Sequence, residues 1–133
     1  MGDEQAAGQP TCILLVEDDD RTLSAMGRLL RLNGYQIYTA QTAVEAMALA
    51  DEHRCDVVVC DIGLPDRTGT DLMRDLKVLY DPKGIAVTGF DDPQTARLTE
   101  RAGFDRHLVK PVLFTALLDA IRDLLPPEPH PQA

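Results

Sequence analysis

Basic residues, cysteines and long apolar runs are all scarce in this sequence of 133 residues. Lysine and arginine number 13 against 22 aspartates and glutamates, which gives a formal net charge of −9 at pH 7. Most faces of such a protein would repel DNA, so we expect no direct contact with nucleic acid. No segment has the ~18 apolar residues that a membrane span needs, and the amino terminus lacks a signal-peptide pattern, so we expect no membrane association.

The cysteines are few and poorly spaced for covalent or metal chemistry. Cys12, Cys55 and Cys60 are odd in number and show no CxxC spacing. Neither a disulfide nor a zinc site is predicted, and a reducing, cytoplasmic environment is expected. What the chain does contain is 44% hydrophobic residues, enough to build one core in a protein of this length.

Short apolar segments alternate with longer amphipathic ones from residue 11 to residue 125. Continuously apolar runs such as CILLV and VVVC are typical of parallel strands covered on both faces. Right-handed crossovers would wind this alternation into an α/β fold, a single flavodoxin-like (βα)5 doubly wound parallel sheet with strand order 2-1-3-4-5. Flanking this domain, 11-125, we expect a flexible N-terminal extension, 1-10, and a Pro-rich C-terminal tail, 126-133. The expected strands are residues 12–16, 36–40, 56–62, 84–88 and 106–110.

The last three amphipathic segments differ in how well they could be anchored. The third, which starts at about residue 70, has leucines at helical spacing and is expected to bury Leu79 with the others. The fourth, residues 93–102, has few apolar positions, Leu98 among them, so we expect a weakly held helix. The fifth, residues 112–125, has a strong apolar face and should pack firmly.

Every central strand of the expected sheet ends in polar residues. Glu17 and Asp18 follow the first strand, and Asp61, Thr88 and Lys110 end the third, fourth and fifth. Because such sheets gather the carboxyl ends of their strands at one rim, the carboxylates should cluster there and require a cation. Hard oxygen ligands without nearby His or Cys indicate Mg²⁺. Singly, each residue could equally be a helix cap, a turn residue or a solvated lysine, but together they are the components of phosphoryl transfer onto a carboxylate.

The sequence also resembles a known family, the response-regulator receiver domains of two-component signalling, over about residues 11 to 125. The resemblance implies that Asp61 is the phosphoacceptor, Thr88 a switch hydroxyl and Lys110 the phosphoryl-binding lysine. Where the family most often has a Tyr or Phe as a second switch residue, this sequence has His107. The resemblance rests on LLVEDD at 14–19, DIGLP at 61–65, Gly69, AVTGF at 86–90 and GFDRHLVKP at 103–111.

The same resemblance implies a metal site and an unusual peptide bond. Mg²⁺ would be held by Glu17, Asp18, Asp61 and the backbone carbonyl of Gly63. The peptide bond between Lys110 and Pro111 would be cis, which the tertiary amide of proline makes accessible.

The function that the resemblance implies is that of a phosphoacceptor in a two-component phosphorelay. A histidine kinase or a histidine phosphotransfer protein would supply the phosphoryl group. A downstream protein target would then bind the surface formed by the fourth helix, the fifth strand and the fifth helix. The chain would not be an enzyme beyond catalysing its own phosphorylation at Asp61 and slow dephosphorylation. It would be a stand-alone regulator or a receiver excised from a larger protein.

Two other functions remain open from the sequence. The first is a receiver-like interaction module that works without phosphorylation, although such modules usually lack acidic or lysine positions that this chain retains. The second is a small phosphohydrolase that uses Asp61 catalytically. That chemistry would need a general acid two residues after the nucleophile, where this chain has Gly63.

Overall fold

The computed structural model of the protein describes residues 10–125 and contains one parallel five-stranded sheet, in the order β2-β1-β3-β4-β5. The predicted fold class and strand order are therefore confirmed. The predicted tail at 126-133, and all of the predicted 1-10 extension except Pro10, lie outside the described residues. The elements are β1 (Cys12–Val16), α2 (Asp20–Leu32), β2 (Gln36–Ala40), α3 (Ala43–Glu52), β3 (Val57–Asp61), α4 (Gly69–Leu79), β4 (Lys83–Thr88), α5 (Pro93–Ala102), β5 (Arg106–Val109) and α6 (Phe114–Leu124).

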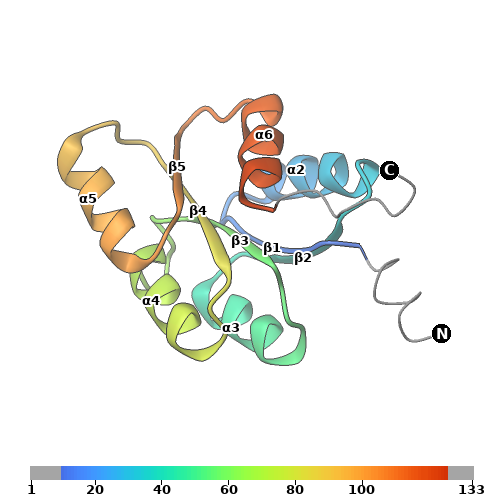
Figure 1. Ribbon diagram of the computed structural model, residues 1–133, viewed down its shortest axis with the longest axis horizontal. Coiled ribbons are helices and arrows are strands. Elements are labelled where there is room, and N and C mark those ends of the chain that lie inside the picture. The colour runs from blue at the N-terminus through green and yellow to red at the C-terminus, as the bar shows by residue number, and fades with distance from the viewer. Residues whose placement is uncertain (1–9, 126–133) are drawn as a thin grey trace, which may run out of the picture.

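Helices cover both faces of the sheet, with α2 and α6 on one face and α3, α4 and α5 on the other (Figure 1). Every residue of β1 is buried, as is every residue of β3. Along β1, Ile13 and Leu15 face the α2 and α6 layer, whereas Leu14 and Val16 face the opposite layer. This alternation of side chains across a strand explains why both central strands are continuously apolar.

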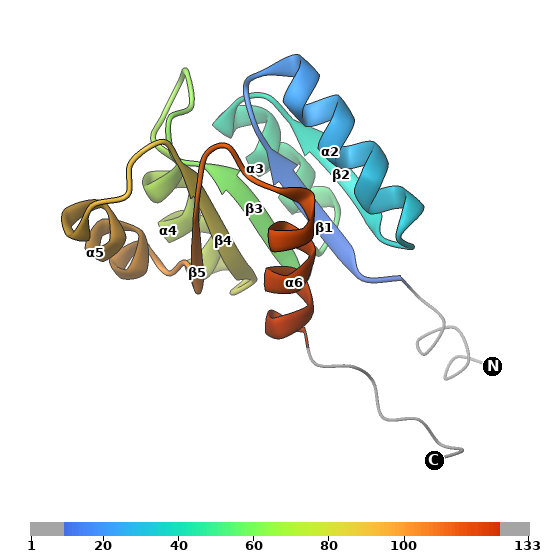
Figure 2. The ribbon, with the colours of Figure 1, turned by 90° about the horizontal axis from the view of Figure 1, so that it is seen from above.

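The loops that follow β1, β3, β4 and β5 meet at one end of the sheet (Figure 2). Four of the helices that begin near this end are capped by a side-chain oxygen that accepts a backbone N–H of the first turn. The caps satisfy donors that have no partner within the helix. The fifth helix, α6, starts after Leu113 and has no side-chain cap. The capping residues are Asp19 for α2, Thr42 for α3, Thr68 for α4 and Asp92 for α5.

The strand limits differ from the predicted ones by single residues. β3 is one residue shorter at each end. At its amino end, the Asp56 carboxylate accepts the Cys12 N–H at 2.9 Å. β4 starts one residue earlier, where the Lys83 N–H donates to the Asp56 carbonyl at 3.0 Å. β5 ends one residue earlier, at Val109, beside Pro111, which has no N–H to continue the pairing. Helix α6, at Phe114–Leu124, is likewise shorter than the predicted helix at 112–125.

Two leucines predicted to help anchor their helices are exposed. Leu79 is 56% exposed, because α4 ends there and the next residue, Tyr80, packs against the core instead. Leu98 is 45% exposed, and the buried residues of α5 are Thr99 and Ala102. The helix therefore buries even fewer apolar residues than the sequence predicted.

None of the helices between residues 10 and 125 is both long and apolar enough to cross a membrane.

Candidate functional site

Three carboxylates from two neighbouring strands meet at the carboxyl edge of the sheet. Glu17 and Asp18 directly follow β1, and Asp61 is the last residue of β3, the strand paired with β1. One ligand oxygen from each lies within 4.8 Å of the others. Glu17 and Asp61 are buried, at 5% and 6% exposed, whereas Asp18 is exposed to solvent. The predicted carboxylate cluster is therefore present in the structure.

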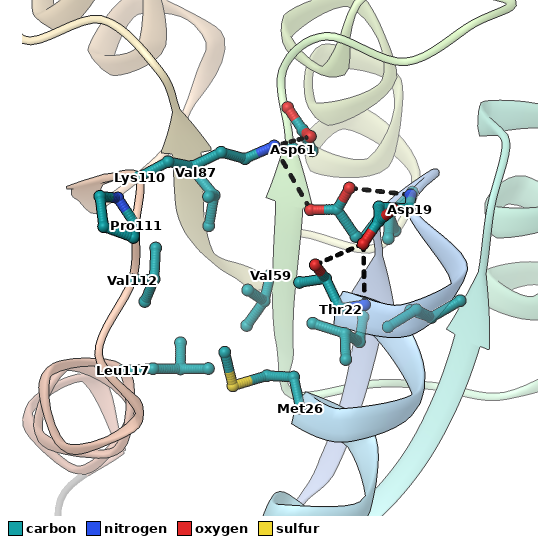
Figure 3. A pocket seen from close by; sticks show the side chains of 14 residues that line it. Asp19, Thr22, Met26, Val59, Asp61, Val87, Lys110, Pro111, Val112 and Leu117 are labelled. Atoms are coloured by element: carbon teal, nitrogen blue, oxygen red, sulfur yellow. Dashed lines mark hydrogen bonds and ion pairs between the residues drawn. The ribbon is translucent and has the colours of Figure 1, made fainter.

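Lys110 reaches this cluster from the end of β5. Its Nζ atom lies 2.6 Å from Asp61 Oδ2 and 3.5 Å from Glu17 Oε1 (Figure 3). The peptide bond from Lys110 to Pro111 is cis, as the family resemblance implies. Lys110 thus contacts two of the three carboxylates, and its single charge leaves the site with an excess of negative charge.

The two buried carboxylates are oriented in the same way, each by one backbone amide and by Lys110. The Gly63 N–H donates to Asp61 Oδ1 at 2.9 Å, and the Asp19 N–H donates to Glu17 Oε2 at 3.0 Å. In both side chains it is the other oxygen that faces Lys110. Charge-assisted bonds of this kind fix the direction of a carboxylate, so both groups are held in place before any ligand arrives.

The pKa shifts reflect this crowding of charge. Burial raises the pKa of Glu17, the hydrogen bond from Asp19 opposes that rise, and the nearby Asp61 carboxylate adds to it. For Lys110, burial lowers the pKa, but the hydrogen bond and charge of Asp61, together with the charge of Glu17, outweigh this effect and raise it. The lysine is therefore held as a cation beside the two carboxylates.

Thr88 and His107, the predicted switch residues, lie outside this hydrogen-bonded group. Thr88 is fully buried at the end of β4, where its Oγ1 accepts the N–H of Phe90 at 3.1 Å. The Nε2 atom of His107, on β5, is buried and finds no hydrogen-bond partner among residues 10–125. In the described part of the chain no hydrogen bond joins either side chain to Asp61 or Lys110.

A largely apolar hollow of about 550 Å³ opens beside the cluster. Its walls come from the sheet, from α2, from the β5–α6 connection and from α6, and they include Met26, Val112 and Leu117 (Figure 3). Asp61 and Lys110 lie at one end of the hollow. A partner could therefore place apolar side chains in the hollow while it contacts the polar cluster.

Two residues, one in the β3–α4 loop and one at the start of α4, make contacts that sequence reasoning missed or only noted as part of a motif. Asp66, in the β3–α4 loop, accepts the N–H groups of Ala43 and Val44 at 2.9 and 3.0 Å, so it caps α3 from 22 and 23 residues away. No local signal could identify that pairing, because it depends on where the two loops meet. Gly69, the first residue of α4, packs against the backbone of Asp61 and Ile62.

The close contact at Gly69 predicts a large effect of substitution. A Cβ atom there would lie 2.5 Å from the Asp61 carbonyl oxygen and 2.7 Å from Ile62 Cα, and backbone cannot yield as a side chain can. Gly69→Ala should therefore lower the free energy of unfolding by about 2–3 kcal/mol, measured by urea denaturation. In the control Gly27→Ala, the new Cβ would make ordinary contacts, the nearest at 3.5 Å, so stability should be unchanged or higher. Equal stability of the two variants would contradict the prediction.

The model of the response regulator receiver domain family matches residues 13–122, which is most of the chain. The chain belongs to that family. Its relatives include the transcriptional regulatory protein KdpE of Mycobacterium tuberculosis, 32% identical over 112 residues that span 84% of this chain and 50% of the relative. This receiver domain is also similar to a solved CheY-like receiver domain protein from Methanospirillum hungatei, with a TM-score of 0.82, 32% identity and coverage of 86% of this chain and 93% of the other.

A third similar protein was solved in a chemically informative state. It is a response regulator from Burkholderia pseudomallei, described as containing a phosphorylated aspartic acid, a calcium ion and citrate. The TM-score is 0.78 at 26% identity, and the match covers 83% of this receiver domain and 65% of that protein. The chain spans about half the length of the curated regulators that it matches, such as KdpE. Another curated relative, from Thermotoga maritima, is named a cyclic di-GMP phosphodiesterase, and the match covers 27% of its length.

Proposed function

We propose that this receiver domain is a Mg²⁺-dependent phosphoacceptor, in which Asp61 takes a phosphoryl group from a histidine kinase or a histidine phosphotransfer protein. The observation that carries the proposal is the geometry around Asp61. This buried carboxylate lies 2.6 Å from the Lys110 ammonium and beside Glu17 and Asp18. The phosphorylated aspartic acid of the Burkholderia pseudomallei relative supports the same chemistry. The domain would act as a signalling switch that catalyses only its own phosphorylation and slow dephosphorylation.

The residues of the chain suit this transfer step. An Asp61 carboxylate oxygen would form the new bond to phosphorus as the bond from phosphorus to the donor's histidine nitrogen breaks. The Gly63 N–H holds Asp61 Oδ1, so the carboxylate cannot turn away from the incoming group. Lys110 already bonds Oδ2, and its ammonium would donate to a phosphoryl oxygen once the group is attached.

The donor set of the site fits Mg²⁺. Glu17, Asp18 and Asp61 offer carboxylate oxygens within 4.8 Å of one another, and one lysine cannot neutralise all three charges. We propose that these residues, with the backbone carbonyl of Gly63, hold the ion. Bound there, Mg²⁺ would supply positive charge next to the phosphoryl oxygens.

The phosphodonor would bind over the hollow beside Asp61. Apolar side chains of the donor would contact the walls formed by α2 and the β5–α6 connection, as that lining is mostly hydrocarbon. Its phosphohistidine would then lie at the end of the hollow where Asp61 and Lys110 are found. Family membership supports the donor class, and the hollow offers a surface for such a donor.

The output surface would be α5, β5 and α6. Thr88 would leave its bond with the Phe90 N–H to donate to the phosphoryl group, and His107 would respond with it. Because the buried residues of α5 are only Thr99 and Ala102, the helix can shift at a low cost in free energy. Exposed apolar residues on or beside these elements, Phe90, Leu98 and Leu113, are then available to a downstream protein.

Incubation with acetyl phosphate and Mg²⁺ tests the proposal against the two other functions. We expect a mass increase of one phosphoryl group per chain, which peptide mapping places on Asp61. An interaction module that works without phosphorylation would take up no label. A phosphohydrolase would release inorganic phosphate continuously without accumulating label.

The lifetime of the aspartyl phosphate is expected to be long, because neither of the two positions that flank the site, 63 and 90, carries a side chain that could orient a hydrolytic water. The two relevant positions are Gly63, which has no side chain, and Phe90, which is apolar and 68% exposed. The double substitution Gly63→Asn and Phe90→Glu should speed the decay of purified phosphoprotein at least about tenfold. A Cβ at position 63 would lie 3.7 Å from Asp61 Oδ1, an ordinary contact, so the Cβ of the new residue causes no clash.

The control for this prediction is Leu113→Glu, which adds the same charge at another exposed apolar position near the carboxyl edge. It should leave the decay rate of the phosphoprotein unchanged. If the double variant decays no faster than the wild type while its Mg²⁺ affinity is preserved, water access is not controlled at these two positions.

A further inference from the structure

Two cysteines lie side by side at the end of the sheet remote from Asp61. Cys12 is the first residue of β1, and Cys55 lies in the loop between α3 and β3, 43 residues further along the chain. Their Sγ atoms are 2.8 Å apart, compared with about 2.05 Å in a disulfide bond. Cys12 is buried and Cys55 is half-buried. All three cysteines are free in the structure, but the sequence spacing of Cys12 and Cys55 gave no sign that their side chains would meet.

We propose that Cys12 and Cys55 form an intramolecular disulfide when the protein meets a low-molecular-weight disulfide such as oxidised glutathione. The pair is thus a modification site. This proposal is independent of phosphorylation, because the site lies at the amino ends of β1 and β3, whereas the phosphoacceptor lies at their carboxyl ends.

The backbone around the pair is already fixed in a suitable arrangement. Cys12 exchanges two hydrogen bonds with Asp56, the residue after Cys55. The Cys12 N–H donates to the Asp56 carboxylate at 2.9 Å, and the Asp56 N–H donates to the Cys12 carbonyl at 2.8 Å. Bond formation would therefore need a small movement of the sulfurs and little movement of the chain.

The disulfide would form by two successive thiol–disulfide exchange steps. The Cys55 thiolate, on the more exposed residue, attacks one sulfur of oxidised glutathione, forms a mixed disulfide and releases one glutathione thiolate. Cys12 loses its proton to solvent, attacks the Cys55 sulfur and displaces the second glutathione. Two protein thiols are oxidised to one disulfide, and one glutathione disulfide is reduced to two glutathione molecules.

The rate of this exchange should depend strongly on pH. Burial raises the pKa of both thiols, and for Cys55 the hydrogen bond with Cys12 raises it further. Few thiolates are therefore present at neutral pH, so cross-linking should be slow at pH 7 and should accelerate roughly tenfold per pH unit up to about pH 8.5.

The disulfide should also stabilise the domain. It would close a loop that contains β1, α2, β2 and α3, and so restrict the unfolded chain. For a loop of this length we expect Tm to rise by roughly 10 °C, and dithiothreitol should reverse the rise.

The experiment uses the purified, fully reduced protein and oxidised glutathione. We expect mass spectrometry to show the loss of two thiol hydrogens with no retained glutathione, and peptide mapping to join Cys12 to Cys55. The Tm rise should be absent in Cys55→Ala and in Cys12→Ala. It should persist in Cys60→Ala, which removes the third thiol, a fully buried group that bonds the Asp61 carbonyl.

Several results would overturn the proposal. These are a stable glutathione adduct on Cys55 with Cys12 still free, a dimer linked through Cys55, or no change in mass after prolonged incubation at pH 8.5. Should Cys12→Ala fail to fold, Cys55→Ala alone decides the stability readout, because that side chain is only half-buried. Phosphorylation by acetyl phosphate should be the same before and after oxidation, so failure of either proposal leaves the other intact.

Discussion

Replacing Asp61 with asparagine is expected to abolish labelling by acetyl phosphate. The amide has the shape of the carboxylate but lacks the anionic oxygen that attacks phosphorus. Asparagine Oδ1 can still accept the Gly63 N–H, so the local turn after β3 should persist. Only the 2.6 Å bond from Lys110 is lost, and Lys110 keeps Glu17 as a partner. Intact-mass measurement should therefore find no phosphorylated species, while circular dichroism shows a folded domain.

The matched control for this variant is Asp19→Asn. Asp19 lies next to the metal-binding residues proposed above, but its carboxylate caps α2 by accepting the Thr22 N–H at 2.9 Å. The hydrogen bond from the Thr22 hydroxyl, together with this one from the Thr22 N–H, lowers the pKa of Asp19. Asparagine caps helices as well as aspartate does, so labelling should stay near the wild-type level. Full labelling of Asp61→Asn would place the phosphoryl group on another residue and remove the basis of the proposed function.

Mg²⁺ is expected to stabilise the wild-type domain and to lose this effect in Asp18→Ala. A ligand at ten times its dissociation constant adds about 1.4 kcal/mol to the free energy of unfolding, which corresponds to a Tm rise of about 5 °C for a domain of this size. Asp18 is the exposed member of the carboxylate cluster, so its removal should weaken metal binding without opening a cavity in the core. The metal-free variant should therefore melt close to the wild type, but it should respond little to Mg²⁺.

Thermal melts over a range of MgCl₂ concentrations measure this effect without any phosphodonor. Asp20→Ala is the matched control, because Asp20 is an exposed acid in the first turn of α2 and lies outside the three-carboxylate cluster. It should keep the full Mg²⁺ response. An unchanged response in Asp18→Ala would show that the ion is bound elsewhere.

Local patterns in the sequence were sufficient for the fold and for the composition of the site. Apolar runs of strand length alternating with helical periodicity define the order of elements, and right-handed crossovers then restrict the topology to few solutions. The same topology brings the ends of β1, β3 and β5 to one edge. Glu17, Asp18, Asp61 and Lys110 could therefore be assigned to one cluster before their distances were known. Strand limits were less certain, because pairing at a strand end depends on neighbours such as Asp56 and Lys83.

Contacts between segments far apart in the chain were decided only by the tertiary structure. The sequence by itself determined which side chains reach the carboxyl edge, but not that Thr88 bonds the Phe90 N–H or that His107 Nε2 is left without a partner in the described residues. Nor did it indicate that Asp66 caps α3 or that Cys12 meets Cys55. The physical reason is the separation in sequence between the residues that interact. Periodicity and capping depend on neighbours within a few residues, whereas these contacts depend on how completed strands, helices and loops pack against one another.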